Sequence, residues 1–187
     1  MISIQQQFKY LVSNVETKLL DKLQLFNPKI CRINYQYGRL IEIIQTLQTW
    51  SQNPSKQFHT FPLIALGEDF LVRNNNNPYA SCTLNIFIMY PTDRNYKSED
   101  RQTNTFLPIL DPLYDELIDQ IYKCGYFAIY NPLKEMLHDK IEHGNWAPQG
   151  LYSSTGGKTT NTIDEWVDCI EIKNLTLKIE NVYCKPN

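Results

Sequence analysis

The chain lacks the cysteine pattern of a disulfide-framed or zinc-binding protein. Its five cysteines are odd in number, and no two are spaced as Cys-x-x-Cys. They are scattered along the chain at Cys31, Cys82, Cys124, Cys169 and Cys184. Disulfide frameworks and zinc ribbons need paired cysteines at short spacing. We therefore expect neither of them, and we expect a reducing compartment.

A strong net charge and a long apolar segment are also missing. Lys and Arg number 18 against 20 Asp and Glu, so the formal net charge is −2. Such a chain carries no global basic field that would attract nucleic acid or an acidic lipid surface. No apolar run approaches the ~20 residues of a membrane span, and residues 1–7 do not read as a signal segment. We expect a cytosolic protein with no membrane partner.

Apolar periodicity predicts a mixture of helices and strands. Helical spacing occurs in residues 4–23, 39–50 and 98–123. Alternating or short apolar runs predict strands at 33–37, 61–66, 83–90, 126–130 and 166–179. Pro108 and Pro112 should kink or start the third helix, and the segment 133–141 is ambiguous. Residues 143–161 form a long polar loop in what we expect to be a single domain over residues 1–187.

Residues 61–122 form the most informative segment, because two strands and a helix follow one another there. We predict a hairpin between the strands, with a polar tip at Arg73, Asn74, Asn75, Asn76, Asn77 and Tyr79. In the second strand Leu84, Ile86, Ile88 and Tyr90 should share one face. Phe87 and Met89 then lie on the other face, where large apolar side chains indicate either a second core layer or a subunit interface.

Three constellations suggest chemistry, and each has a simpler interpretation. The segment 154–160 ends like a phosphate-binding loop at Gly157 and Lys158, but Tyr152 stands where the motif requires glycine. We therefore expect a solvated loop. Glu135, His138, Glu142 and His143 lie close in sequence, and on a helix His138 and Glu142 would share a face, as metal ligands can. A third ligand at matching spacing is missing, so we expect no metal.

Carboxylates also gather at the start of the last predicted strand, at Asp164, Glu165, Asp168 and Glu171. Paired carboxylates perform acid–base chemistry only in a pocket that shifts their pKa values. Solvated charges that discourage wrong strand pairing are the simpler interpretation. The sequence therefore predicts no catalytic residue, no cofactor and no enzyme.

Several local phrases resemble a known family of assembly proteins. They lie at residues 37–44, 61–66, 84–88, 101–110, 138–141 with Trp146, and 168–175. The chain resembles the small ring-forming proteins at the neck or tail of tailed bacteriophages: the head–tail connector, tail-completion and tail-terminator proteins. The likeness is closest to those of Bacteroidetes and crAss-like phages, and it covers roughly residues 30 to 180.

The resemblance implies a tail-terminator-like α+β fold, in which helices pack on one face of a mainly antiparallel sheet. It also implies a homo-oligomeric ring of about six or twelve copies, in a virion assembled in the bacterial host cytoplasm. Its partners would be other neck and tail proteins, and genomic DNA would pass through the channel without sequence-specific binding. Phe87, Met89 and Tyr90 are then the candidate subunit interface. Two alternatives stay open: a soluble interaction or adaptor domain, and a nucleotide-dependent enzyme.

Overall fold

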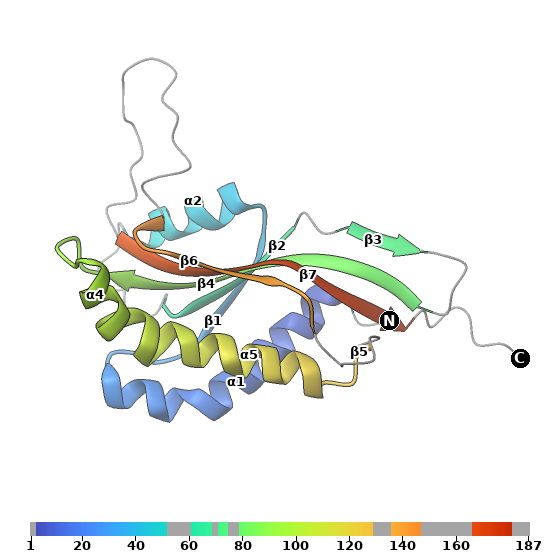
Figure 1. The fold of residues 1–187 in the computed structure, drawn as a ribbon, viewed down its shortest axis with the longest axis horizontal. Coiled ribbons are helices and arrows are strands. Elements are labelled where there is room, and N and C mark those ends of the chain that lie inside the picture. The colour runs from blue at the N-terminus through green and yellow to red at the C-terminus, as the bar shows by residue number, and fades with distance from the viewer. Residues whose placement is uncertain are drawn as a thin grey trace, which may run out of the picture.

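The computed structural model describes residues 3–51, 61–68, 71–74, 79–128, 136–146 and 166–180. Its architecture is α+β, as the sequence predicted: one mixed, mostly antiparallel sheet with helices packed on it (Figure 1). Within these ranges the strands are β1 (Asn34–Gly38), β2 (Leu63–Gly67), β3 (Leu71–Asn74), β4 (Tyr79–Thr92), β5 (Phe127–Ala128), β6 (Asp139–His143) and β7 (Trp166–Glu180). The helices are α1 (Ile4–Phe26), α2 (Leu40–Ser51), α4 (Ser98–Arg101), the π-helix η1 (Gln102–Leu110) and α5 (Asp111–Lys123).

The long strands β4 and β7 form the centre of the sheet. The strand order is β1-β2-β4-β7-β5, with β3 paired to β4 and β6 paired to β7. All of these pairs are antiparallel except β1 with β2. The parallel pair requires a crossover, and α2 supplies part of it. The strand β4 pairs with three others, β2, β3 and β7, and so joins most of the sheet together.

The first helix begins at the predicted residue, Ile4, and runs to Phe26, three residues past the predicted end. The Ser3 side chain caps the backbone N–H of Gln6, and the Gln6 side chain accepts from the Ser3 N–H, which together form a capping box. Its apolar stripe is buried from Phe8 to Leu23. Asn27 ends the helix in an extended conformation, as expected for a residue before proline.

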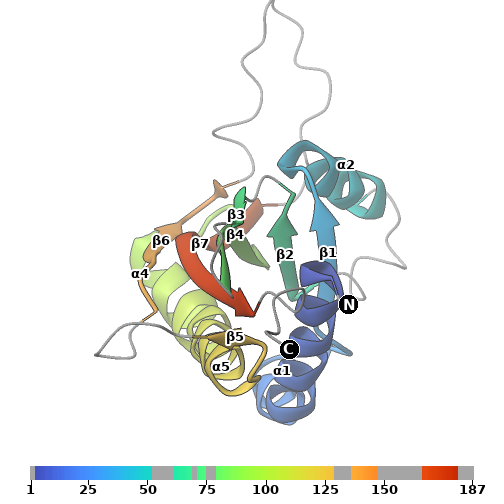
Figure 2. The same cartoon turned by 90° about the vertical axis from the view of Figure 1, so that its right-hand side faces the viewer.

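The helices cover the sheet from two sides. Neighbouring residues of a strand point to opposite faces of the sheet, and side chains of β1 contact a helix on each face. The Tyr35 hydroxyl donates to the Gln5 carbonyl of α1 over 3.1 Å, whereas Gln36 donates to the Thr46 hydroxyl of α2 over 3.0 Å. Figures 1 and 2 show α1 and α5 together beneath the strands and α2 above them. Packing on one face therefore describes α1 and α5, while α2 lies on the other face.

The two prolines of the third helical segment act differently. Pro108 lies inside the π-helix η1, where the Asp111 N–H bonds five residues back to the Phe106 carbonyl. The wider turn accommodates a residue that has no N–H to donate. Pro112 lies in the first turn of α5, which continues directly from the helical Leu110, and its fixed φ suits a helix. The expectation that a proline starts a helix is met at Pro112, whereas Pro108 lies inside the π-helix.

The second face of the sheet is closed by the chain itself. Phe87 and Met89 are buried, and the Trp146 ring lies 5.4 Å from the Phe87 ring. Tyr90 is also buried, on the α1 side, where its hydroxyl accepts from the Asn27 amide over 2.6 Å. This corrects the candidate subunit interface at Phe87, Met89 and Tyr90: these side chains belong to the core of one chain. The second core layer is the better interpretation of the Phe87 and Met89 face.

Candidate functional site

An open cleft of about 510 Å³ lies where the end of α1, the end of β4 and the π-helix meet. Its lining includes Phe26 from α1, Tyr90 and Asp93 from the end of β4, and Asn104 and Pro108 from η1. Most groups that face it are aromatic, aliphatic or uncharged polar, and Asp93 is the charged member of the lining. Such a lining can receive an amphipathic side chain or an extended segment of another protein.

The α1 wall of the cleft is tied directly to the sheet. Asn27 closes α1 by donating its backbone N–H to the Leu23 carbonyl over 2.9 Å, and its side chain donates to the Tyr90 hydroxyl. Burial raises the pKa of Tyr90, and the hydrogen bond from Asn27 lowers it by a smaller amount. The phenol is therefore neutral at physiological pH, with its own O–H left as a donor at the edge of the cleft.

A buried ion pair fixes the opposite wall. Arg101 donates to the Asp168 carboxylate over 2.7 Å, and both side chains are almost fully buried. The same guanidinium donates to the Thr92 hydroxyl over 3.2 Å and to the Tyr96 carbonyl over 2.9 Å. Thr92 and Tyr96 both line the cleft. One arginine thus connects the start of β7 to the loop that shapes the cleft.

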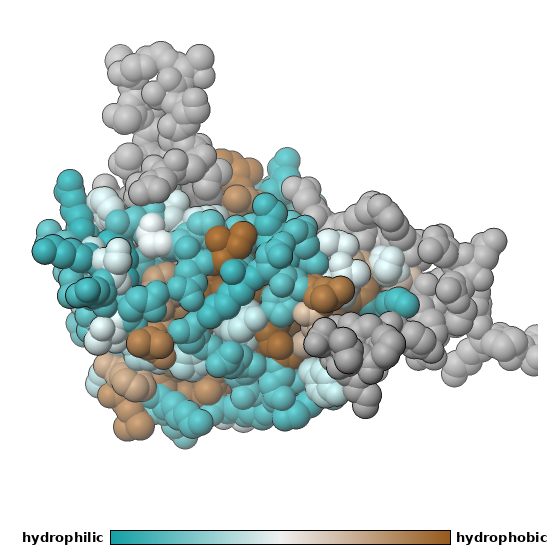
Figure 3. Space-filling view, viewed as in Figure 1, coloured by the Kyte–Doolittle hydropathy of each residue, from teal (hydrophilic) through white to brown (hydrophobic). Residues whose placement is uncertain are grey.

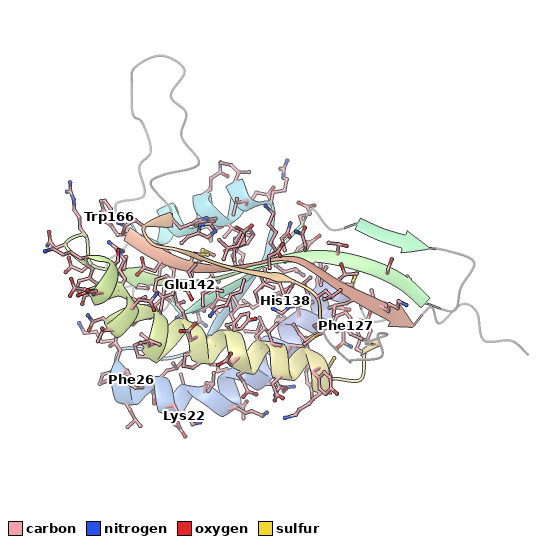
Figure 4. All side chains as sticks on the ribbon, in the orientation of Figure 1. Lys22, Phe26, Phe127, His138, Glu142 and Trp166 are labelled. Carbon is pink, nitrogen blue, oxygen red and sulfur yellow. The ribbon has the colours of Figure 1, made fainter. Side chains whose placement is uncertain are left out.

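Apolar side chains flank the cleft and face solvent. Leu25 is 84% exposed, Phe26 66% and Leu107 62%. Leu107 lies one turn along η1 from the cleft residue Thr103, so it belongs to the same end of the molecule. Apolar atoms gather at this end of α1 on the surface in Figure 3, and Figure 4 labels Phe26 there. We call Leu25, Phe26, Leu107 and the cleft between them the cleft end.

The residues singled out for metal binding are separated by their strand. His138 precedes β6 and Glu142 lies four residues further on, about 13 Å away along an extended strand, while His143 points to the face opposite Glu142. His138 bonds to the Tyr114 hydroxyl over 2.7 Å, and Glu142 accepts from the Gln102 amide over 2.9 Å. His143 instead pairs with Glu171 over 2.9 Å. In the described ranges, no three His, Cys, Asp or Glu side chains gather as a metal site requires.

The tautomer of His138 follows from its partners. Its Nδ1 lies 2.7 Å from the Met136 carbonyl, which only accepts, so Nδ1 carries the proton. In this tautomer Nε2 carries no proton and accepts from the Tyr114 hydroxyl over 2.7 Å. Burial raises the pKa of Tyr114, which keeps that hydroxyl protonated and able to donate. This histidine holds β6 against α5, and its nitrogens are occupied.

The acidic cluster is also divided. Asp168 pairs with Arg101 inside the molecule, whereas Glu171 pairs with His143 on the other face of β7. Asp164 and Glu165 lie outside the described residues, as do Glu135 and the phosphate-loop-like segment 154–160. The two carboxylates that the structure places do not face one another and do not form an acid–base pair.

The predicted hairpin tip is shorter than the sequence suggested. Arg73 and Asn74 are the last residues of β3, where they pair with Ser81 and Ala80 of β4. Tyr79 begins β4, and Asn75, Asn76 and Asn77 lie outside the described residues. Pairing with β4 extends β3 through Arg73 and Asn74, the two residues that the sequence placed at the start of the loop.

Comparison with protein-family models, with curated proteins and with solved structures finds no match to this chain. None of the helices that the structure describes combines the length and the apolar character needed to cross a membrane.

Sequence reasoning missed the cleft end. Its walls come from three segments that are distant in the chain, and no short motif joins them. One signal was present: Leu25 and Phe26 are adjacent apolar residues at the end of a helix, beside the helix-ending pair at residues 27–28. Leu25 does not fall at the three- and four-residue spacing of the buried stripe that runs to Leu23, so its side chain had to face solvent or a partner.

Proposed function

We propose that this chain is a non-enzymatic assembly protein: the subunit of a homo-oligomeric ring in the neck or tail of a tailed phage. The ring would join the portal or connector to the tail and line the DNA channel. The observation that carries the proposal is the cleft end, where Phe26 lines an open cleft and Leu25 and Leu107 expose further apolar side chains at the same end of the molecule. An apolar patch beside a preformed cleft is typical of a protein contact.

The size of the patch is informative. Fully covering a leucine or phenylalanine contributes roughly 1.5–3 kcal/mol, so these three side chains supply about 4–9 kcal/mol at most. Rigid-body association alone costs about 4–15 kcal/mol. The three side chains therefore cannot hold a complex by themselves, and the cleft walls must also be filled. A subunit whose contact is completed only in a closed ring meets that requirement, because every copy then gains two interfaces.

The charge and the side-chain chemistry agree with this role. With a net charge of −2 the chain would not hold DNA electrostatically, which suits a channel through which DNA must slide. In the part of the chain that the structure describes, the histidines, the buried acid and the buried arginine are engaged with one another or with the fold. We find no nucleophile beside a base there.

Mass in solution tests the proposal. Sedimentation velocity over a range of concentrations, with the portal and tail proteins of the same phage added in a second series, should give a discrete multiple of 22.0 kDa. Negative-stain images should show closed rings with a central hole. A protein that stays monomeric in both series is not a ring subunit, and that result would favour the adaptor-domain alternative.

A surface variant gives the matched comparison. Phe26→Asp should shift the protein toward monomers, because a charge replaces an apolar side chain at the cleft. Ile41→Asp, on α2 at the other face, changes an exposed apolar residue in the same way and should leave assembly unchanged. Equal effects of both variants would mean that the cleft end is not the contact surface.

A further inference from the structure

We infer that the contact between copies is head-to-tail: the cleft end of one copy receives the opposite end of the α1–α5 pair of the next copy, which presents Tyr10 and Tyr122. This inference rests on the proposed assembly function and names the partner of its site. Tyr10 is 63% exposed and Tyr122 is 45% exposed. We call these two tyrosines and their surroundings the tyrosine end.

The two ends lie at opposite extremes of one rigid layer. Lys18 of α1 bonds to Glu116 of α5 over 2.7 Å, which sets the alignment of the two helices. They run in opposite directions, so the start of α1 lies beside the end of α5 (Figure 1). The contact between the Phe8 and Phe127 rings, 5.9 Å apart, marks that junction. Figure 4 labels Phe127 there and Phe26 at the other extreme.

Electrostatics favours joining unlike ends. The 23-residue helix α1 has no acidic residue in its first turn and no basic residue in its last turn, so no side chain in those turns offsets its macrodipole. Its start carries a partial positive charge and its end a partial negative one. The exposed Lys9 lies near the positive start, and at the negative end the exposed Asp93 lines the cleft while the exposed Lys22 lies near Phe26 (Figure 4). Head-to-tail contact sets the positive start of one α1 toward the negative end of the next α1, whereas joining like ends would bring dipole ends of the same sign together.

The chemistry of the two surfaces also matches. Tyrosine presents an apolar ring and a polar tip, and it is enriched among the residues that dominate interface energies. The cleft offers the Phe26 ring and Pro108 for the ring, and Asn104 and Thr103 for the hydroxyl. Because the two surfaces differ, the contact is heterologous and repeats from copy to copy until the ring closes.

Complementation between two variants tests the inference. The cleft variant carries Phe26→Asp and Leu107→Asp, and the tyrosine variant carries Tyr10→Asp and Tyr122→Asp. Each alone should lose at least about 100-fold in association constant, since each lacks one half of every contact. Mixed together, they retain one intact cleft end and one intact tyrosine end. The mixture should therefore form a 1:1 dimer and stop there.

Multi-angle light scattering gives the mass of each sample, and circular dichroism melting checks that every variant is folded. The four side chains are exposed, and Tyr10→Ser with Tyr122→Ser replaces the aspartates if a charge within the helix lowers the melting temperature. A tyrosine variant that assembles like the unmodified protein overturns the inference, and so does a mixture that stays monomeric. Either result leaves the ring proposal standing if the unmodified protein forms rings. An unmodified protein that never assembles removes both.

Discussion

Arg101→Met should be among the most damaging single substitutions in this fold. Arg101 and Asp168 form an ion pair whose side chains are 8% and 0% exposed. Without the guanidinium, the Asp168 carboxylate keeps the Asn145 N–H at 3.1 Å as its partner among the described residues. Breaking a buried pair from one side costs about 3–5 kcal/mol, because an uncompensated charge stays inside. For a chain of this length, that loss lowers the melting temperature by roughly 6–20 °C.

A double substitution separates the charge from the packing. Asp168 Oδ2 has no hydrogen-bond partner even in the intact pair. Arg101→Met with Asp168→Leu removes both charges together with this unsatisfied oxygen, and well-packed apolar replacements of buried pairs are often neutral. We therefore expect the double variant to recover at least about 2 kcal/mol relative to Arg101→Met. The matched control is Arg94→Met: Arg94 is exposed and lies 5.5 Å above the Trp166 ring, so its loss should cost about 1 kcal/mol or less.

Urea unfolding followed by circular dichroism and tryptophan fluorescence measures the unmodified protein, Arg101→Met, Asp168→Leu, the double variant and Arg94→Met. Equal slopes with denaturant would show that the unfolded states are comparable. The reasoning fails if Arg101→Met loses less than about 1 kcal/mol, or if the effects of the two single substitutions simply add in the double variant. In either case the pair would not be the anchor of the cleft wall that its contacts indicate.

Further predictions follow from the buried sulfur and the corrected interface. Met89→Asp should lower the free energy of unfolding by about 3 kcal/mol or more, because it buries a charge, and unfolding curves should show this loss before any change in association. Burial raises the pKa of the Cys82 thiol to about 12, so alkylation at pH 8 followed by peptide mass mapping should modify the exposed Cys31 and spare Cys82. Since the unfolded thiol ionises near 9.0, Cys82 contributes stability below that pH and loses it as the pH rises toward 12; urea midpoints should fall from pH 8 to pH 10.5. Lys158→Ala should leave assembly intact, and nucleotide hydrolysis absent from the variant but present in the unmodified protein would contradict the non-enzymatic reading.

Most of the helix and strand predictions rested on local sequence patterns. The apolar spacing of residues 4–23 placed α1 within a few residues of its observed end at Phe26. The same reasoning underestimated β4, which extends from Tyr79 to Thr92 because β3 and β7 pair with residues outside its apolar centre. The ends of a strand depend on the strands that pair with it, and the sequence of the strand itself does not show which strands those are.

The strand β6 shows the limit more clearly. Residues Asp139–His143 are polar apart from one isoleucine, so apolar periodicity could not decide between a helix and a strand there. It is a strand because β7 offers a free edge beside it, with Lys140 opposite Ile172. The anchor of the cleft was hidden for the same reason: Arg101 and Asp168 are 67 positions apart, and nothing in either local segment identifies the other.

Folding and assembly use different apolar residues in this chain, and that separation makes the assembly proposal testable. The sheet buries Phe87 and Met89 within one copy, so a substitution there changes folding first. Leu25, Phe26 and Leu107 are exposed in the isolated chain, so polar substitutions should spare the monomer. Tyr10 and Tyr122 share that property at the other extreme of α1 and α5. Assembly that responds to exposed residues at both ends, while the monomer keeps its melting temperature, is the behaviour that a head-to-tail ring requires and that a single adaptor surface would not produce.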